Sequence, residues 1–183
     1  ANAKTAGYTY MNIGRGWKLN LQETVVPVTQ PGIYSAFKFI YTDADGTEHY
    51  FYKTGQECAY KILDEDGLGF ELLEESGPIY TITDKQKNKK TFNSAGYITK
   101  IEDANGNSLH ITYDCNGTRI NKVTDGTGRE TNFIYNTGNA LISVKDPSLR
   151  ETTFQYSTTY NGSLSSTATN YLRKITYPDG TFS

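Results

Sequence analysis

Apolar and polar residues alternate in several short segments of the second half of the chain. Ile111 and Tyr113 are separated by Thr112 and preceded by His110, and the alternation returns at 132–135 and 153–156, where Phe and Tyr hold the apolar places. A period of two is typical of a β-strand with one covered face. These segments are therefore predicted to be strands whose polar alternates, such as His110, Thr112 and Asn132, face water or a lumen.

A second kind of segment precedes each such strand and carries two aliphatic residues three positions apart. The pairs are Ile98 and Ile101, Ile120 and Val123, Leu141 and Val144, and Leu172 and Ile175. This spacing would suit a helix, but the runs are short, rich in β-branched residues and closed by turn residues, whereas a lone helix needs about 12 residues. We predict strands here too. A spacing of three puts the pair on opposite faces unless a bulge intervenes, and we expect both faces of the inner copies to be covered.

Turns rich in Gly, Asn and Asp close these strands, and equivalent positions return every 21 or 22 residues. Asp and Asn side chains accept local backbone N–H groups, and Gly and Asn tolerate left-handed backbone. The residues that define the repeat are Ile101, Asp103, Gly106, Tyr113, Asp114, Gly117, Val123, Asp125, Gly128, Tyr135, Gly138, Val144, Asp146 and Tyr156.

The predicted fold is all-β, with consecutive antiparallel β-hairpins of about 21–22 residues forming a curved, extended sheet of a spiral or solenoid-like kind. A single hairpin buries too little apolar surface to offset the entropy lost on ordering its chain, so each copy must pack on its neighbours. The 15 Tyr and 8 Phe, against one Met and one Trp, suit the half-buried surface of such a sheet.

The repeat resembles the YD repeat of the Rhs family. Tyr113-Asp114 is the dipeptide that names the repeat, Tyr177-Pro178-Asp179-Gly180 is similar to a frequent variant, and Gly14-Arg15-Gly16-Trp17 is similar to the start of an Rhs repeat region. Tyr135-Asn136 and Tyr156-Ser157 depart from the dipeptide. The family's self-cleaving aspartate-proline motif is not carried over, because Leu149 stands where its Gly belongs.

The resemblance implies a function and a location. The chain would be the N-terminal part of the repeat region of a larger bacterial protein, secreted or attached to the cell wall or surface. It would form a non-enzymatic β-sheet shell that encloses or presents a C-terminal toxin domain outside this chain. Its partners would be the remainder of its own chain, with further repeats and that C-terminal domain.

Repeat quality divides the chain into three segments. We expect a lead-in segment at 1–35, degenerate repeats at 36–96, and YD repeats at 97–183 with an inserted loop near 157–170. Long insertions in repeat arrays tend to fall on one face and to contact partners.

Charge and hydropathy exclude some partners. The net charge of −2 does not favour a nucleic acid, which requires a clustered basic face. Lys85, Lys87, Lys89 and Lys90 are interpreted as a solvated turn. No window approaches the roughly 18 apolar residues of a membrane span.

Reactive groups are scarce, so no enzymatic activity, cofactor or metal site is predicted. The two His residues, His49 and His110, lie in strand-like runs, and we interpret both as solvated or lumen-facing strand residues. The Asp43-Ala44-Asp45-Gly46 stretch departs from a calcium loop in its Gly spacing. Cys58 and Cys115 can form one disulfide or remain thiols, and we favour thiols. The alternative function is a surface carbohydrate-binding module. Burial of Tyr113, Tyr135 and Tyr156 would weaken that alternative and leave off-register tyrosines such as Tyr160 and Tyr171 as its candidates.

Overall fold

The computed structural model of the chain describes residues 13, 17–28, 37–53, 59–62, 68–75, 77, 79–157, 159–160, 163–164 and 171–183. These residues contain strands and no helix. The strands are β1 (Thr24–Pro27), β2 (Phe37–Thr42), β3 (Glu48–Lys53), β4 (Ala59–Ile62), β5 (Glu71–Glu75), β6 (Ile79–Thr83), β7 (Lys89–Phe92), β8 (Ile98–Glu102), β9 (Ser108–Tyr113), β10 (Ile120–Asp125), β11 (Glu130–Tyr135), β12 (Leu141–Lys145), β13 (Glu151–Ser157), β14 (Thr159–Tyr160), β15 (Ser163–Leu164) and β16 (Tyr171–Thr176).

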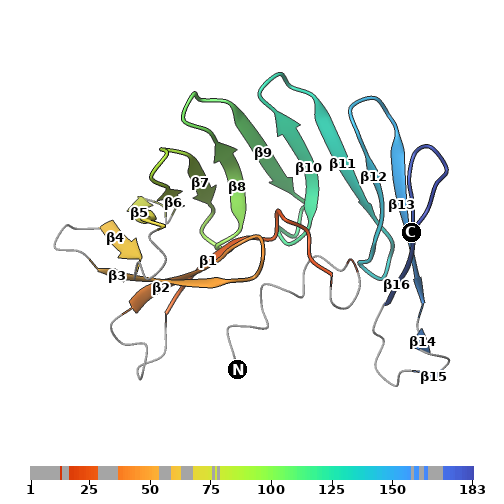
Figure 1. Cartoon of the computed structure of the whole chain (residues 1–183), viewed down its shortest axis with the longest axis horizontal. Helices are drawn as coiled ribbons and strands as arrows, with labels where there is room; N and C mark the ends of the chain where they lie inside the picture. The colour runs from red at the N-terminus through yellow and green to blue at the C-terminus, as the bar shows by residue number, and fades with distance from the viewer. Residues whose placement is uncertain are drawn as a thin grey trace. The chain divides into compact units, whose positions relative to one another are not determined.

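Fourteen of these strands form one sheet in which spatial order follows chain order. The order runs from β1 to β13 without a crossover and ends at β16, while β14 and β15 pair with each other (Figure 1). The paired strands are antiparallel throughout. The predicted all-β fold of consecutive antiparallel hairpins is confirmed. The β14–β15 hairpin lies where the inserted loop was expected, at 157–170.

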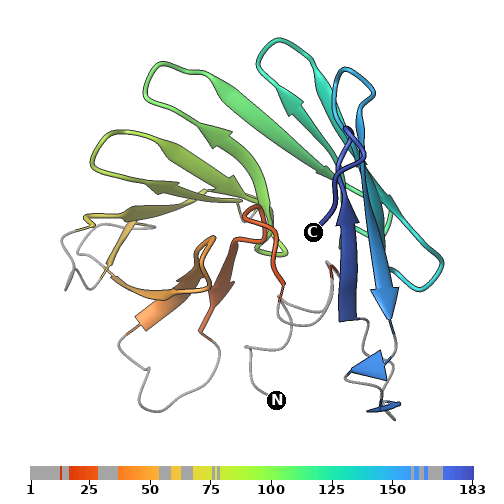
Figure 2. The same ribbon diagram turned by 45° about the vertical axis from the view of Figure 1, so that its right-hand side comes forward.

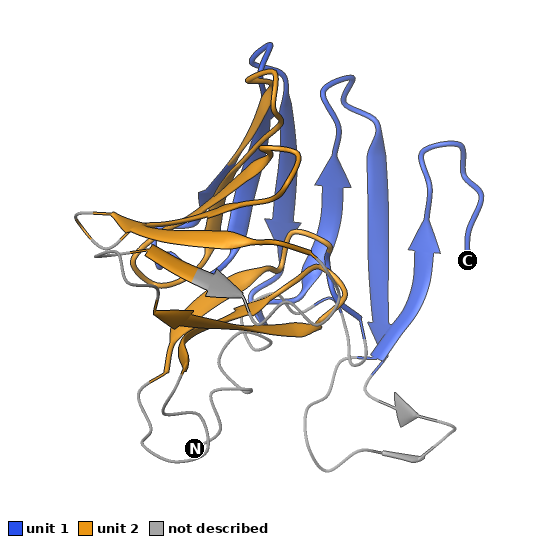
Figure 3. Ribbon diagram, turned by 60° about the vertical axis from the view of Figure 1, so that its left-hand side comes forward, with its two compact units in different colours: residues 1–19, 111–183 blue, residues 20–110 orange. Residues whose placement is uncertain are grey.

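The chain divides into two compact units (Figure 3). The first consists of residues 1–19 and 111–183, and the second of residues 20–110. We call the second unit the N-terminal roll and the first the C-terminal sheet. Their boundary at residue 110 differs from the boundaries at 35 and 96 that repeat quality suggested.

In the N-terminal roll the strands curl so that β2 meets strands several places away in the ladder. The Phe39 ring on β2 lies 4.8 Å from the Tyr60 ring on β4 and 5.1 Å from the Tyr80 ring on β6. Tyr41, also on β2, lies 5.9 Å from Phe92 on β7. All five rings are buried. Aromatic side chains therefore fill the interior of the roll, as the Tyr-rich composition favours.

The C-terminal sheet has one largely apolar and one largely polar face. Strand pairing places a set of largely apolar side chains from β10 to β16 on one face: Val123, Thr131, Phe133, Tyr135, Leu141, Val144, Thr152, Phe154, Tyr156, Leu172 and Ile175. Their alternates form the opposite face, which carries the Lys122–Glu130 ion pair at 2.6 Å. The hairpins β10–β11 and β12–β13 stand side by side in Figure 2. As predicted, Asn132 and Thr112 of this sheet are exposed, and so is His110 at the end of the N-terminal roll.

The expectation that the aliphatic pairs point to opposite, covered faces is wrong for three of the four pairs. A register shift follows the first aliphatic residue in β8, β12 and β16. In β8, Ile98 pairs with Phe92, whereas Lys100 pairs with Thr91, so that one residue of β8 has no partner. Equivalent shifts follow Leu141 in β12 and Leu172 in β16. A β-bulge of this kind inserts one residue into a strand and returns the pair to one face.

One turn design recurs throughout both units. In each of these turns Oδ1 of the first residue accepts a hydrogen bond from the backbone N–H of the fifth, and the fourth residue has positive φ. The turns begin at Asp43, Asp84, Asn93, Asp103, Asp114, Asp125, Asn136 and Asp146. From Asn93 onward they start ten or eleven residues apart, so each sequence repeat contains two of them.

Most of the repeat-defining Asp and Gly residues occupy these first and fourth places, with one difference in register. In the turn that begins at Asn136, the fourth place belongs to Asn139 with φ of 65°, and Gly138 precedes it. Leu149 takes the fourth place of the Asp146 turn with φ of 64°. A left-handed backbone is strained for a residue with a branched side chain.

Candidate functional site

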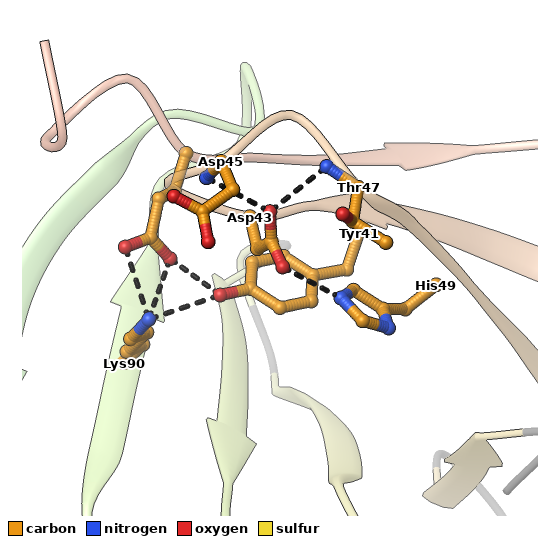
Figure 4. Close-up of polar contacts among 7 residues, drawn as sticks. Tyr41, Asp43, Asp45, Thr47, His49 and Lys90 are labelled. Atoms are coloured by element: carbon orange, nitrogen blue, oxygen red, sulfur yellow. Dashed lines mark hydrogen bonds and ion pairs between the residues drawn. The ribbon is translucent and has the colours of Figure 1, made fainter. Parts of the chain in front are cut away.

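A polar cluster lies inside the otherwise aromatic N-terminal roll (Figure 4). The Tyr41 hydroxyl donates to Oε2 of Glu23 at 2.5 Å. Nζ of Lys90 donates to both carboxylate oxygens of Glu23, at 2.9 and 2.8 Å, and to the Tyr41 hydroxyl at 3.0 Å. The Glu23 side chain is 4% exposed and that of Lys90 is 33% exposed. The three groups thus satisfy one another, as buried charges must.

A second polar pair packs directly against this cluster. The His49 ring is stacked on Tyr41 with centroids 5.4 Å apart, and its Nε2 lies 2.9 Å from Oδ2 of Asp43. The other carboxylate oxygen of Asp43 accepts the backbone N–H groups of Asp45 and Thr47. Asp43 therefore caps a turn and orients a buried imidazole at the same time.

The chemistry available to these residues is limited. Burial raises the pKa of the Tyr41 hydroxyl well above its usual value, and the Glu23 carboxylate raises it further. The pKa of Asp43 is lowered. Burial acts against this, but the hydrogen bonds from His49 and the turn outweigh it. Among the described residues, His49 contacts the rings of Tyr41 and Phe70 and the carboxylate of Asp43. Among the described residues no group of three or more His, Cys, Asp or Glu side chains could hold a metal ion.

The cluster marks the place where the roll closes on itself. Glu23 directly precedes β1, which pairs with β2 along one edge. On its other edge β1 meets the turn between β7 and β8, where the Val25 N–H donates to the Gly96 carbonyl at 2.9 Å and Thr24 forms an antiparallel bridge with Tyr97. Lys90 comes from β7, the strand just before this turn. We call this junction of β1 with the 93–97 turn the seam.

Gly96 makes the seam possible. It has φ of 83°, and a Cβ on it would lie 2.1 Å from the Val25 carbonyl oxygen. Real Cβ atoms do not approach an oxygen so closely, so only Gly allows β1 to lie against this turn. The comparable glycines Gly106 and Gly128 also have positive φ, but nothing lies within 4 Å of their Cβ positions.

The predicted tyrosine positions lie on the C-terminal sheet and are half-buried. The Tyr156 hydroxyl donates to the Leu141 carbonyl at 2.6 Å, and burial raises the pKa of Tyr156 to about 12. The Tyr135 ring lies 5.1 Å from the Arg119 guanidinium, and its buried hydroxyl has no hydrogen-bond partner among the described residues. Tyr113 is also half-buried. These rings are used in packing, although none is completely covered.

The remaining predicted sites are placed as follows. Tyr171 is half-buried on β16, whereas the side chain of Tyr160 lies outside the described residues, as do Gly14, Arg15, Gly16 and Cys58. Cys115 is an exposed free thiol. The interpretation of the lysine run as solvated holds for Lys85, Lys87 and Lys89 and is wrong for Lys90, which points into the roll.

Sequence reasoning did not find the Glu23–Tyr41–Lys90 cluster, and it placed His49 on a solvated or lumen-facing strand. His49 is in fact buried. A weak signal was present, since Tyr41 and His49 share the alternation of Phe39 and Phe51 and so belong to the same interior face. The partner of Lys90 is 67 residues away in sequence and had no signal of its own.

Comparison with known proteins adds no assignment: no protein-family model matches the chain, and no curated protein matches it. The part of the chain that the structure describes contains no helix of the length and apolarity required to cross a membrane.

Proposed function

We propose that this chain is a non-enzymatic wall of a β-sheet shell of the Rhs/YD-repeat kind, belonging to a secreted or cell-surface bacterial protein. Such a wall encloses or presents another polypeptide, and the repeat resemblance implies that this polypeptide is a C-terminal toxin domain outside this chain. The observation that carries the proposal is the two-faced C-terminal sheet, whose largely apolar side chains share one face across β10 to β16 while the opposite face is largely polar.

Three further features support a structural role. Phe133 and Phe154 on the apolar face are half-buried, so apolar surface remains available for contact with another polypeptide. The polar cluster of the roll satisfies its own hydrogen bonds and lies at the seam. From Asn93 onward the turns repeat one design at an interval of ten or eleven residues, which suits a sheet extended by adding similar units.

Binding of an unfolded polypeptide tests the proposal. The probe is fluorescein-labelled α-lactalbumin that has been reduced and carboxymethylated, and the readout is fluorescence anisotropy. Phe154→Glu places a charge on the apolar face, whereas Gln155→Glu places the same charge one residue away on the polar face. We expect the first variant to lose binding and the second to keep it.

Circular dichroism establishes that both variants are folded, and Phe154→Ser replaces Phe154→Glu if the charged variant does not fold. Failure of the parent chain to bind the probe, or equal loss of binding in the two variants, contradicts a role of the apolar face in enclosure.

A carbohydrate-binding module is the second candidate. It is favoured by the incomplete burial of Tyr113, Tyr135 and Tyr156, since a partly exposed ring offers a face on which a sugar can stack. A glycan array distinguishes the two functions: tight binding of one sugar class, lost in Tyr171→Ala or Tyr135→Ala, would rank this candidate first.

A further inference from the structure

We infer that β1 is a detachable strap that closes the N-terminal roll and opens without the unfolding of β2 to β8. This inference stands on the seam alone and does not depend on the proposed function. The contacts of β1, the nature of the side chains at the seam and the surface beneath the strap support it in turn.

The backbone contacts of β1 are limited in extent. The strand is four residues long, ends at Pro27 and stands at one end of the sheet order. Its second edge meets a turn instead of a strand, through the Val25–Gly96 hydrogen bond and the Thr24–Tyr97 bridge. Strands β5 and β6, by comparison, are both flanked by ladders of several residue pairs. Elements with fewer contacts open at lower free energy than the rest of a domain.

Beside the buried Val25, polar side chains close the seam. The Glu23–Lys90 pair is desolvated on the Glu23 side, and the cost of desolvation offsets much of the Coulomb attraction of a buried pair. Such a pair discriminates strongly against misplaced partners while adding little net stability. Glu23 and Lys90 are therefore suited to position the strap and to release it at a low cost in free energy.

Opening of the strap would uncover a specific surface. Val25 is fully buried, and β1 covers one edge of β2 through the pairs from Thr24–Thr42 to Pro27–Phe39. Release of β1 frees the backbone groups on this edge and admits water to the cluster around Tyr41. The strap thus controls access to the aromatic interior of the roll.

Hydrogen–deuterium exchange of the full chain in low concentrations of urea tests the inference. We expect the amide of Val25 to exchange at least about tenfold faster than that of Leu72 on β5, and with a weaker dependence on urea, because subglobal opening exposes less surface than global unfolding. Equal exchange free energies and equal urea dependence for the two amides would overturn the inference, since the roll would then open only as a whole.

Two variants extend the test. Glu23→Gln keeps the size of the side chain and removes its charge, and it should accelerate exchange in β1 while leaving Leu72 unchanged. Glu130→Gln is the matched control, because it breaks the Lys122–Glu130 pair on the polar face of the C-terminal sheet and should affect neither amide. Equal acceleration of Val25 and Leu72 in Glu23→Gln would contradict a separate strap.

A disulfide provides the converse experiment. Thr24→Cys with Tyr97→Cys, in a chain with Cys58→Ser and Cys115→Ser, links the bridged pair across the seam. The oxidised chain should slow exchange in β1 to the rate of β5, and reduction should restore it. If β1 exchanges at the same rate in the oxidised and reduced chains, the inference of a detachable strap is contradicted. If the disulfide does not form, the Glu23→Gln comparison remains the test of the strap.

Discussion

Replacing Gly96 with Ala should destabilise the chain more than the same replacement at Gly106. Both glycines have nearly the same left-handed backbone, with φ of 83° and 88°. A residue with a Cβ pays about 1 to 2 kcal/mol for this conformation, and the more restricted unfolded chain of Ala returns about 0.4 to 1 kcal/mol. Gly106→Ala, whose Cβ would meet nothing within 4 Å, should therefore cost about 1 kcal/mol.

Gly96→Ala carries the same conformational cost and an additional one at the seam. Its Cβ would lie 2.1 Å from the Val25 carbonyl oxygen, so β1 has to move away from the turn. The Val25–Gly96 hydrogen bond is then lost, at about 1 kcal/mol, together with part of the roughly 1.5 to 3 kcal/mol gained by burying Val25. The total is about 3 kcal/mol.

Urea denaturation followed by circular dichroism measures both costs. The free energy of unfolding should fall about three times as far in Gly96→Ala as in Gly106→Ala, because only Gly96→Ala also disrupts the seam. Exchange should rise in β1 of the first variant only. If the two variants lose the same stability, the close approach at Gly96 is not what holds the seam, and the reasoning fails.

Four other changes have expected outcomes. Leu149→Asn should stabilise the chain by about 0.5 to 1 kcal/mol, because it relieves a left-handed backbone at an 81% exposed site; a lower urea midpoint would show that the backbone there is unstrained. Asp125 has a lowered pKa because Thr127 and the Arg129 backbone donate hydrogen bonds to its carboxylate. Its contribution to the stability of the fold is therefore present above the pKa of Asp in the unfolded chain, and it is lost as the pH falls towards the pKa in the folded chain. Asp125→Asn should accordingly reduce the loss of stability below pH of about 4, and an unchanged acid-unfolding profile would refute this. Lys90→Met should lower the free energy of unfolding by about 1 to 3 kcal/mol, since it leaves the Glu23 carboxylate buried without its cation, although the partial exposure of Lys90 limits this loss. Adding Glu23→Gln to the same chain should restore part of the lost stability. If the losses of the two single variants simply add in the double variant, Glu23 and Lys90 are not coupled. In a spectrophotometric titration Tyr156 should ionise near pH 12, and Tyr156→Phe should remove that step.

The strand positions were predictable because alternation is a local property. Phe133 and Tyr135 indicated their strand and its apolar face from three consecutive residues, and the pairing confirms both. The bulge after Ile98 was not predictable in the same way. Whether a strand with apolar residues three apart is flat or bulged depends on its register against the neighbouring strand. In β8 the pairing of Ile98 with Phe92 of β7 shows the bulge.

The polar cluster depended on the path of the whole roll. Glu23 reads as an ordinary charged residue and Lys90 as the end of a solvated lysine run, and only the return of β1 to the 93–97 turn joins them. The same limit applies to Gly96. Its close approach to Val25 follows from long-range packing, which no local pattern indicates.

Photocrosslinking from the two faces of the C-terminal sheet tests the enclosure role most directly. Benzoylphenylalanine replaces Phe154 on the apolar face or Gln155 on the polar face, and the full chain is irradiated with reduced, carboxymethylated α-lactalbumin. A wall that encloses a polypeptide predicts crosslinks from position 154 and few from position 155. Equal yields from both positions, or none from position 154, would contradict it.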